Sequence, residues 1–165
     1  MSNDAEQSPR PRRSALYMPG ANVRTMEKAR TLDADVLILD LEDAVSPDTK
    51  GQARSQVADA VRQGGYGRRE AVVRINALST PWGQDDLSAV ATLGANAVLI
   101  PKVESRAQVD EVASFLETAG APADLRIWAM IETPLAVMKL GEIASAHPRL
   151  EVLVMGVGFP SSCHF

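Results

Sequence analysis

The sequence predicts an α/β fold built on a parallel sheet, and two features of its pattern lead to this prediction. Six short apolar runs alternate with amphipathic stretches along the 165 residues, and successive runs begin roughly 20–35 residues apart, the size of a βα unit. Each run is almost continuously apolar, as is typical of strands covered on both faces. Such units build either an open doubly wound sheet or a closed barrel of eight. Because the barrel needs about 250 residues, the pattern alone favours the open sheet.

The six apolar runs are the predicted strands. They occupy residues 14–18, 36–41, 71–75, 97–100, 126–131 and 151–155. The gaps between them have lengths that helices fill, and no linker separates a second domain. We therefore expect one folded domain over residues 14–156. A disordered tail is expected over residues 1–13, where the chain is polar and contains two prolines.

Helical start signals occupy three of the gaps, and we predict five helices in all. Ser46–Pro47 and Thr133–Pro134 each pair an N-cap residue with proline at the first helical position. Ser105–Gln108 has the spacing of a capping box. After the last two signals along the chain, apolar residues recur at helical intervals: Val109, Val112, Phe115, Leu116, Leu135, Met138 and Leu140.

Composition excludes several classes of protein. A net charge of −4 and an aromatic content of 4% argue against a nucleic-acid partner, which is normally met by a basic surface or stacking aromatics. A single cysteine excludes a disulfide framework and a zinc site of several cysteines. No apolar run approaches the ~18 residues of a membrane span, and the N-terminus lacks the apolar core of a secretory signal. The expectation is a cytoplasmic protein without a membrane partner.

Polar residues gather where the predicted strands end. In parallel α/β folds the carboxyl ends of the strands meet at one edge and carry the functional site. A single acid there often serves as a helix cap or an ion-pair partner, but five strand ends in register point to one shared site. Its carboxylate oxygens suit Mg²⁺ better than zinc. The segments concerned are Tyr17–Gly20, Asp40–Asp43, Arg74–Asn76, Pro101–Glu104 and Glu132–Pro134.

The same parts of the chain resemble a known family. The likeness rests on five motifs in order, which are Arg13–Gly20 (RSALYMPG), Leu39–Val45 (LDLEDAV), Val73–Asn76 (VRIN), Leu99–Glu104 (LIPKVE) and Met130–Thr133 (MIET). They are similar to the citrate lyase β-subunit family, the CitE-like acyl-CoA lyases of the HpcH/HpaI aldolase superfamily. The resemblance implies a (β/α)8 TIM barrel. Over residues 14–156 this chain would form an incomplete barrel with about six of the eight strands.

The resemblance also implies an activity. Members of this family cleave or form a carbon–carbon bond in a 3-hydroxyacyl-CoA of the malyl-CoA, citramalyl-CoA or citryl-CoA type, with Mg²⁺ as cofactor. The metal polarises the carbonyl of a 2-oxo acid, and a cation near the thioester oxygen stabilises the enolate. The implied partners are therefore an acyl-CoA thioester and a 2-oxo acid. The implied assembly is a homo-oligomer, a trimer or a hexamer.

Matched position by position, four residues correspond to metal and substrate binding. Glu132 corresponds to one of the two direct metal ligands, and so to a substrate contact. Arg74 corresponds to the arginine that grips the substrate and the developing negative charge, a role that suits a planar and permanently charged guanidinium. Glu42 and Asp43 correspond to catalytic carboxylates that hold metal-bound waters.

A second group of residues corresponds to positions that contact the CoA thioester. These are Tyr17 and Met18 in the first predicted strand and Lys28 in the helix expected after it. Lys102 is left without a catalytic role, because a structural or electrostatic role accounts for it equally well.

The sequence leaves the family pattern at its C-terminal end. The family's second metal ligand is an aspartate, and alignment places Phe159 at that position, where no side-chain oxygen is available for Mg²⁺. Residues 157–165 contain no family motif. We therefore expect a C-terminally truncated member with impaired lyase activity, two open sheet edges and an uncovered inner face. Two alternatives stay open: a non-catalytic CoA-binding or interaction protein, and a class II aldolase that acts on a free 2-oxo acid.

Overall fold

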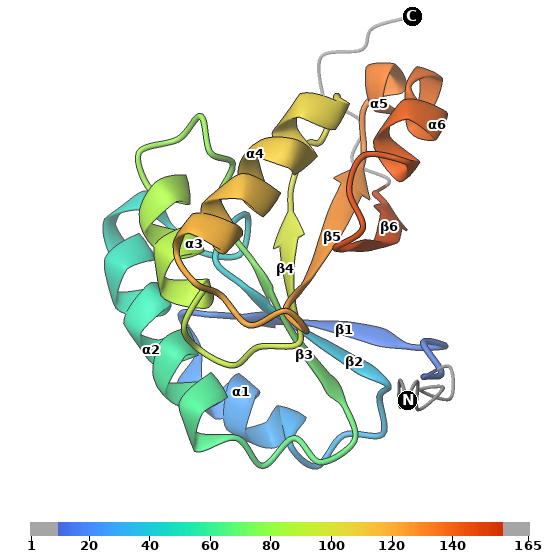
Figure 1. Ribbon diagram of the computed structural model, residues 1–165. Helices are drawn as coiled ribbons and strands as arrows, with labels where there is room; N and C mark the ends of the chain where they lie inside the picture. The colour runs from blue at the N-terminus through green and yellow to red at the C-terminus, as the bar shows by residue number, and fades with distance from the viewer. Residues whose placement is uncertain (1–9, 157–165) are drawn as a thin grey trace, which may run out of the picture.

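The computed structural model describes residues 10–156, which form one sheet of six strands (Figure 1). Residues 1–9 and 157–165 lie outside the described residues, and with them most of the expected tail and the Phe159 position. The predicted strands are confirmed, with bounds that differ by at most one residue at either end. They are β1 (Ala15–Pro19), β2 (Val36–Asp40), β3 (Glu70–Arg74), β4 (Ala97–Ile100), β5 (Arg126–Ile131) and β6 (Leu150–Met155).

The described chain contains six α-helices, one more than predicted, and one 3₁₀ helix. Ser46 precedes the 3₁₀ helix η1 (Pro47–Thr49), which leads directly into α2. None of the helices in residues 10–156 combines the length and the apolar character that a bilayer crossing requires. The α-helices are α1 (Val23–Ala29), α2 (Lys50–Gln63), α3 (Gly83–Val90), α4 (Arg106–Thr118), α5 (Pro134–Met138) and α6 (Leu140–Ala144).

The other two predicted helix starts are confirmed, but one apolar pattern does not mark a buried face. The side chain of Gln108 accepts a hydrogen bond from the backbone N–H of Ser105 at 3.1 Å, as expected for a capping box. Thr133 Oγ1 caps α5, which ends at Met138, and a separate helix, α6, begins at Leu140. Met138 is 86% exposed and Leu135 is 43% exposed. The apolar spacing in α5 therefore lies mainly on the surface.

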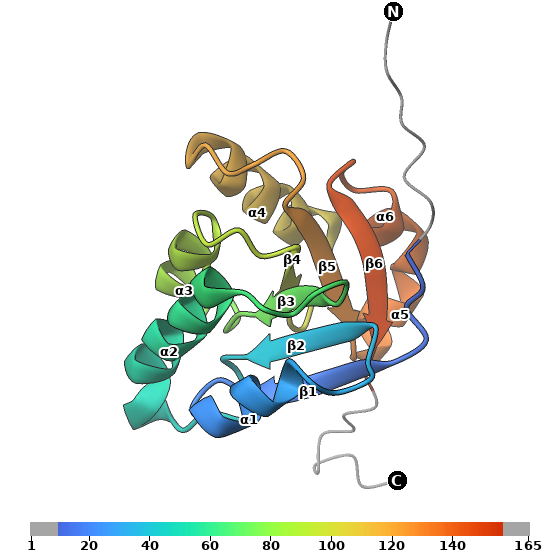
Figure 2. The ribbon, with the colours of Figure 1, turned by 90° about the horizontal axis from the view of Figure 1, so that it is seen from below.

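The strands follow one another across the sheet in chain order, and every neighbouring pair is parallel. A doubly wound sheet reverses its strand order at a switch point, so the open doubly wound sheet that the pattern alone favoured is wrong. Sequential parallel strands are instead the arrangement of a (β/α)8 barrel, as the resemblance implied. Figure 2 shows the sheet curving, with α1 to α4 along its outer side.

Each face of the sheet carries a hydrophobic core. On β2, Leu37 and Leu39 pack against the helices, whereas Val36 and Ile38 point to the inner face of the curve. The inner core is at most 5% exposed, so the expectation of an uncovered inner face is wrong at the centre of the sheet. Burial of this kind stabilises the fold by about 25 cal/mol per Å² of apolar surface. The inner core consists of Val36, Ile38, Val72, Ala97, Leu99, Trp128 and Met130.

Arg12 closes the inner face at the amino ends of the strands. It donates from Nε to Glu70 Oε2 at 2.6 Å and from Nη2 to Glu70 Oε1 at 2.8 Å. Its Nη2 also lies 2.9 Å from Glu151 Oε1, and its guanidinium lies over the Trp128 ring, 5.2 Å from the centroid. Because Glu70 is in β3 and Glu151 is in β6, one side chain reaches both only if the sheet curves.

The expectation of a disordered tail over residues 1–13 needs correction at its C-terminal end. Arg12 is held by Glu70, and Arg13 Nη2 lies 2.8 Å from Asp35 Oδ1. Of their carboxylate partners, Glu70 belongs to β3 and Asp35 directly precedes β2. The sequence pattern of the tail gives no sign of these contacts. The folded part of the chain therefore includes at least Arg12 and Arg13.

Candidate active site

A buried arginine–aspartate pair lies at the centre of the polar cluster at the carboxyl ends of the strands. Arg74, the last residue of β3, donates from Nε to Asp40 Oδ1 at 2.7 Å and from Nη2 to Asp40 Oδ2 at 2.6 Å. Asp40 ends β2, and the strand register places it directly beside Arg74. The guanidinium fork matches the two carboxylate oxygens, so the pair fixes the direction of both side chains.

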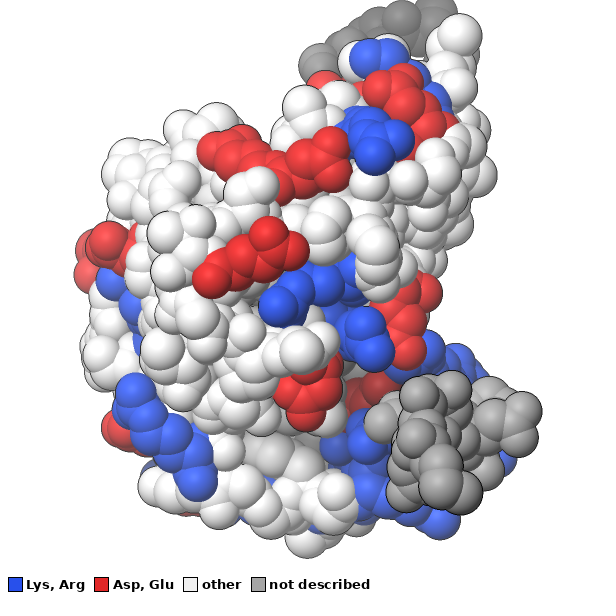
Figure 3. All heavy atoms as spheres, in the orientation of Figure 1, with Lys and Arg blue, Asp and Glu red and all other residues white. Residues whose placement is uncertain are grey.

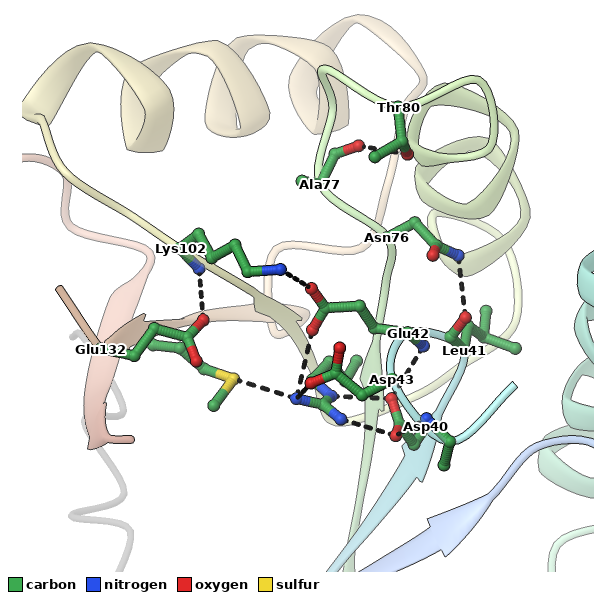
Figure 4. A network of polar contacts seen from close by, with 12 residues as sticks. Asp40, Leu41, Glu42, Asp43, Asn76, Ala77, Thr80, Lys102 and Glu132 are labelled. Carbon is green, nitrogen blue, oxygen red and sulfur yellow. Dashed lines mark hydrogen bonds and ion pairs between the residues drawn. The ribbon is translucent and has the colours of Figure 1, made fainter. Parts of the chain in front are cut away.

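Two further carboxylates approach the remaining edge of Arg74. Its Nη1 lies 3.2 Å from Glu42 Oε2 and 3.3 Å from Asp43 Oδ2. The Glu42 side chain is buried, whereas that of Asp43 is 67% exposed. Figure 4 shows Asp40, Glu42 and Asp43 gathered in one network, and acidic and basic side chains also lie next to one another on the face drawn in Figure 3. The three predicted catalytic residues are thus brought together.

Lys102, in the loop after β4, joins two carboxylates of the cluster. Its Nζ donates to Glu42 Oε1 at 2.9 Å, and its backbone N–H donates to Glu132 Oε1 at 2.8 Å (Figure 4). The backbone of Lys102 has a φ of 51°, in the left-handed region that side chains other than glycine rarely adopt. One residue therefore links the loop after β2 to the end of β5.

The loop after β2 is fixed by buried polar contacts. The Asp40 carboxylate accepts hydrogen bonds from the N–H of Glu42 at 2.8 Å and of Ala44 at 3.2 Å. Lys50, at the start of α2, donates from Nζ to the carbonyl of Leu41 at 2.8 Å and to that of Glu42 at 2.5 Å. Burial lowers the pKa of Lys50. The Glu42 backbone is thus held in place before any ligand arrives, which is the condition for electrostatic preorganisation.

Asn76 extends this support to the loop after β3. Its Nδ2 donates to the carbonyl of Leu41 at 2.9 Å and to Asp86 Oδ2 at 2.6 Å. Asp86, in α3, is completely buried and also accepts a hydrogen bond from Arg54 Nε at 2.7 Å. Asn76 therefore ties the loop after β2 to α3 and uses its side-chain donor within the protein.

Burial and pairing shift the protonation of the cluster. Burial alone would lower the pKa of Arg74, but its hydrogen bonds to Asp40 and the charges of its acidic neighbours outweigh this effect and raise it. Burial raises the pKa of Glu42, and Lys102 offsets the rise only in part. Burial also raises the pKa of Tyr17, whose ring centroid lies 5.0 Å from the Arg74 guanidinium. Arg74 is therefore a permanent cation, and Glu42 takes up a proton more readily than an exposed carboxylate does.

Glu132 follows β5 and lies against the end of β6. A Cβ added at Gly156, the residue after β6, would lie 2.8 Å from Glu132 Cβ and 3.2 Å from Glu132 Oε2. Real Cβ atoms do not approach so closely, so glycine at this position lets the carboxylate keep its place. The N–H of Gly156 donates to the carbonyl of Ile131 at 3.0 Å, which fixes the approach.

The donor chemistry of the cluster fits Mg²⁺, although the described residues supply only part of a ligand set. Carboxylate oxygens are the protein ligands that Mg²⁺ prefers. Among the described residues, Glu42 Oε2 is buried and accepts no hydrogen bond, although Arg74 Nη1 lies 3.2 Å from it, so the oxygen retains capacity to accept a hydrogen bond from ordered water. Within residues 10–156, no group of three or more metal-binding side chains is arranged to hold an ion. Glu132 is the candidate ligand here, and the Phe159 position lies outside the described part.

The three residues predicted to contact a CoA thioester are placed in different surroundings. Tyr17 lies on the inner face beside Arg74 and belongs to the cluster. Met18 points the opposite way into the core between sheet and helices, so its side chain is not available to a ligand. Lys28 is exposed in the last turn of α1. Of these residues, only Tyr17 is brought to the cluster.

Sequence reasoning missed the roles of Asp40 and Lys102 within the cluster. A signal for Asp40 was present, because the period of two along β2 puts Val36, Ile38 and Asp40 on the same face. An aspartate at that position of an otherwise apolar strand needs a buried cationic partner. For Lys102 there was no comparable signal, since its left-handed backbone depends on the loop that surrounds it.

The fold and the cluster together define a class of protein. Sequential parallel strands with carboxylates and an arginine at their carboxyl ends are the arrangement of (β/α)8-barrel domains. The sequence profile of the HpcH/HpaI aldolase/citrate lyase family matches residues 13–158. The chain belongs to the HpcH/HpaI aldolase/citrate lyase family.

Individual relatives place the chain more closely. It is 46% identical over 146 residues to a (3S)-malyl-CoA thioesterase of Cereibacter sphaeroides. The alignment covers 88% of this chain and 49% of that protein. It is 36% identical over 154 residues to an L-malyl-CoA/beta-methylmalyl-CoA lyase of the same organism. That alignment covers 89% of this chain and 48% of the lyase. The chain thus spans about half the length of the curated relatives it matches.

A solved structure supports the same fold. Protein CitE from Mycobacterium tuberculosis, crystallised with magnesium, acetoacetate and coenzyme A, is 32% identical to this chain and superimposes with a TM-score of 0.69. The match covers 88% of this chain and 50% of that one. The barrel-type fold is therefore supported by sequence and by structure.

Proposed function

We propose that this chain carries metal- and substrate-binding residues of an Mg²⁺-dependent enzyme that cleaves a carbon–carbon bond in 3-hydroxyacyl-CoA thioesters of the malyl-CoA type. The observation that carries the proposal is the cluster in which Arg74 meets Glu42 and Asp43, and Lys102 connects them to Glu132. The names of the relatives and the ligands of the similar structure support this substrate class. Because the chain spans about half of its relatives, the complete activity is part of the proposal.

In this proposal Arg74 binds an anionic oxygen of the substrate. Its Nε and Nη2 are committed to Asp40, so Nη1 is the donor that remains. Nη1 lies 3.2 Å from the buried Glu42 Oε2 and 3.3 Å from the exposed Asp43 Oδ2. Of these two carboxylates Asp43 has the solvent access to move away, so it is the one that an incoming anion replaces. Because the guanidinium is always charged, it stabilises negative charge as soon as that charge develops.

Glu132 is the proposed direct ligand of the cation, through the Oε2 atom that its hydrogen bond to Lys102 leaves free. When bound there, Mg²⁺ supplies Lewis-acid polarisation of the oxo-acid carbonyl. Glu42 and Asp43 accept hydrogen bonds from water around the cation, and Glu42 Oε2, which lies 3.2 Å from Arg74 Nη1, accepts no hydrogen bond from the described residues.

Cleavage breaks the bond between the hydroxyl-bearing carbon and the carbon next to the thioester. The hydroxyl loses its proton, the bonding pair passes to the thioester as an enolate, and the enolate takes up a proton at carbon. The products are a 2-oxo acid and an acyl-CoA. In this proposal Tyr17, whose ring covers the guanidinium of Arg74, keeps water from that face and so strengthens the field that the charge provides.

A second candidate is hydrolysis of the thioester, which the 46% identity to (3S)-malyl-CoA thioesterase favours. It uses the same binding groups. The difference is that water attacks the thioester carbonyl and the carbon–sulfur bond breaks, giving a free acid and CoA.

One experiment separates these outcomes. The purified chain is incubated with Mg²⁺ and (3S)-malyl-CoA, and the products are identified by mass spectrometry, with Glu132→Gln as the matched control. Acetyl-CoA and glyoxylate are expected from the wild type, at the reduced rate implied by phenylalanine at position 159, and not from the control. Malate and free CoA would instead establish the thioesterase.

Two other results would support the remaining alternatives. A rise in melting temperature with CoA but without turnover would indicate a non-catalytic CoA-binding protein, since a ligand stabilises the state that it binds. Mg²⁺-dependent aldol chemistry on pyruvate without CoA would indicate an aldolase for free 2-oxo acids. No response to Mg²⁺, CoA or malyl-CoA would reject the proposal for this chain.

A further inference from the structure

We propose that Lys102 is a positioning residue that gives two carboxylates different roles: it presents Glu132 to a divalent cation and keeps Glu42 away from that cation. The proposal deepens the function proposed above and rests on it. It is drawn from the backbone of Lys102, from its two hydrogen bonds and from the charges around them.

The backbone of Lys102 is strained. Among the described residues it is the only one other than glycine with a positive φ, at 51°. Left-handed residues are usually glycine, asparagine or aspartate, because short polar side chains offset the strain through local hydrogen bonds. Lysine has no such compensation. Strain of this kind persists where the surrounding structure requires it, and it is concentrated at functional sites.

Two contacts accompany this strained conformation. The backbone N–H donates to Glu132 Oε1 at 2.8 Å, while Nζ donates to Glu42 Oε1 at 2.9 Å. Figure 4 shows Lys102 reaching both carboxylates from one loop. With Oε1 of Glu132 occupied, Oε2 is the oxygen left for a cation. Glu42 is held between the Lys102 ammonium and Arg74 Nη1, which lies 3.2 Å from Glu42 Oε2.

The charge of Lys102 has opposite effects on a cation and on an anion at this site. An ammonium group beside a cation site repels the cation, and it attracts the carboxylate of an anionic substrate. It also neutralises Glu42, which would otherwise compete with the substrate for the cation. Removing the ammonium should therefore tighten binding of the cation and weaken cation-dependent binding of a 2-oxo acid. A residue that only supported the fold would weaken both.

The test measures both affinities by isothermal titration calorimetry, with Mn²⁺ alone and then with pyruvate in the presence of saturating Mn²⁺. Lys102→Met removes the charge and keeps the backbone N–H. We expect the Kd for Mn²⁺ to fall at least threefold and the Kd for pyruvate to rise at least tenfold. Lys102→Arg keeps a cation at this position and should restore both values to within about threefold of the wild type.

A glycine variant and a distant control isolate the cause. Lys102→Gly also removes the ammonium and keeps the N–H, but glycine adopts the left-handed backbone without strain. It should reproduce the opposite shifts with a melting temperature no lower than that of the wild type. Arg62→Met removes a cation of similar exposure, 60% against 57% for Lys102, that is likewise paired with a carboxylate. It should leave both affinities unchanged.

The possible results separate this proposal from the function on which it rests. If both affinities fall together in Lys102→Met and Lys102→Gly, the residue has a structural role and the positioning proposal is overturned, while the proposed function stands. If the wild-type chain itself binds no Mn²⁺, the proposed function is rejected for this chain and the positioning proposal falls with it. Opposite shifts in both variants, with recovery in Lys102→Arg, establish it.

Discussion

The two ends of the curved sheet are built alike around an arginine, but they differ in how its charge is balanced by carboxylates. Each end holds an arginine on the inner face, Arg12 at the amino ends of the strands and Arg74 at the carboxyl ends. Each arginine forms a two-pronged pair with one carboxylate, Glu70 or Asp40. Each also lies over an aromatic ring, with centroid distances of 5.2 and 5.0 Å.

The difference lies in the balance of charge. At the amino ends, Glu70 and Glu151 are matched by Arg12 and by Arg10, whose Nη1 lies 3.8 Å from Glu70. At the carboxyl ends, carboxylates outnumber cations, and Glu42 Oε2 shares Arg74 Nη1 with Asp43 Oδ2. A balanced end closes the fold, whereas an end with surplus negative charge suits the cation of the proposed function. This agrees with the general division in barrel folds between a stabilising amino face and a functional carboxyl face.

The largest expected effect comes from the central pair at the carboxyl ends. Arg74→Met leaves Asp40 buried without a cationic partner, and breaking a buried ion pair on one side costs about 3–5 kcal/mol of stability. Urea unfolding of the variant and the wild type measures this loss. The contrast between the two ends is lost if Arg74→Met costs no more than the equivalent change at Arg12.

The next prediction concerns the affinity of the cation site rather than the stability of the fold. Gly156→Ala places a Cβ against Glu132, which has to move by several tenths of an ångström. We expect Mn²⁺ affinity to fall about 10–100-fold, as for other residues that orient metal ligands. Gly141→Ala is the matched control, because a Cβ there meets nothing within 4 Å. An unchanged Mn²⁺ affinity in Gly156→Ala would remove Glu132 from the proposed ligand set.

A smaller effect is expected at the amino ends. Arg12→Met removes the hydrogen bonds to Glu70, but the Arg12 side chain is partly exposed and Arg10 remains nearby. The loss should be about 1–2 kcal/mol, measured by urea unfolding, with Mn²⁺ affinity equal to that of the wild type. A change in Mn²⁺ affinity here would show that the two ends are coupled and would break the comparison.

The smallest effect is a pH dependence at the same end. The Arg13 hydrogen bonds lower the pKa of Asp35 from 3.8 to about 2. Because the folded pKa lies below the unfolded one, the stabilisation is fully present above pH 4 and is lost as the pH falls toward 2. The stability difference between wild type and Arg13→Met should therefore shrink over this range, as urea titrations at several pH values would record. A difference that stays constant down to pH 2 would contradict the assignment.

Much of the fold could be predicted from the residues, because a continuous apolar run specifies a strand covered on both faces. All six strands were found in this way. The order of the strands across the sheet could not be predicted in this way, since the spacing of βα units is the same in doubly wound sheets and barrels. Only the family resemblance implied the barrel. The start of the helix after Thr133 was predicted correctly. The exposed Leu135 and Met138 show, however, that helical spacing alone does not determine which face is buried.

The candidate site was predictable where it depends on strand ends and not where it depends on loops. Arg74 and Glu42 meet because parallel strands end at one edge. Met18 was assigned to a ligand although its neighbour Tyr17 occupies the inward position, and the alternation along a strand puts only one of the two on each face. Lys102 was left without a role because a left-handed residue is specified by tertiary contacts.

The contact of Arg12 with two distant strands also has a consequence in time. During synthesis Arg12 emerges long before Glu151, and at typical rates of translation the interval is on the order of ten seconds. Throughout this interval Arg12 lacks its contact with Glu151 of β6. Pairings between residues so far apart in the chain form late and slow folding. Closure of this end therefore has to wait until β6 has been synthesised, and until then β5 is an unpaired edge of the nascent sheet.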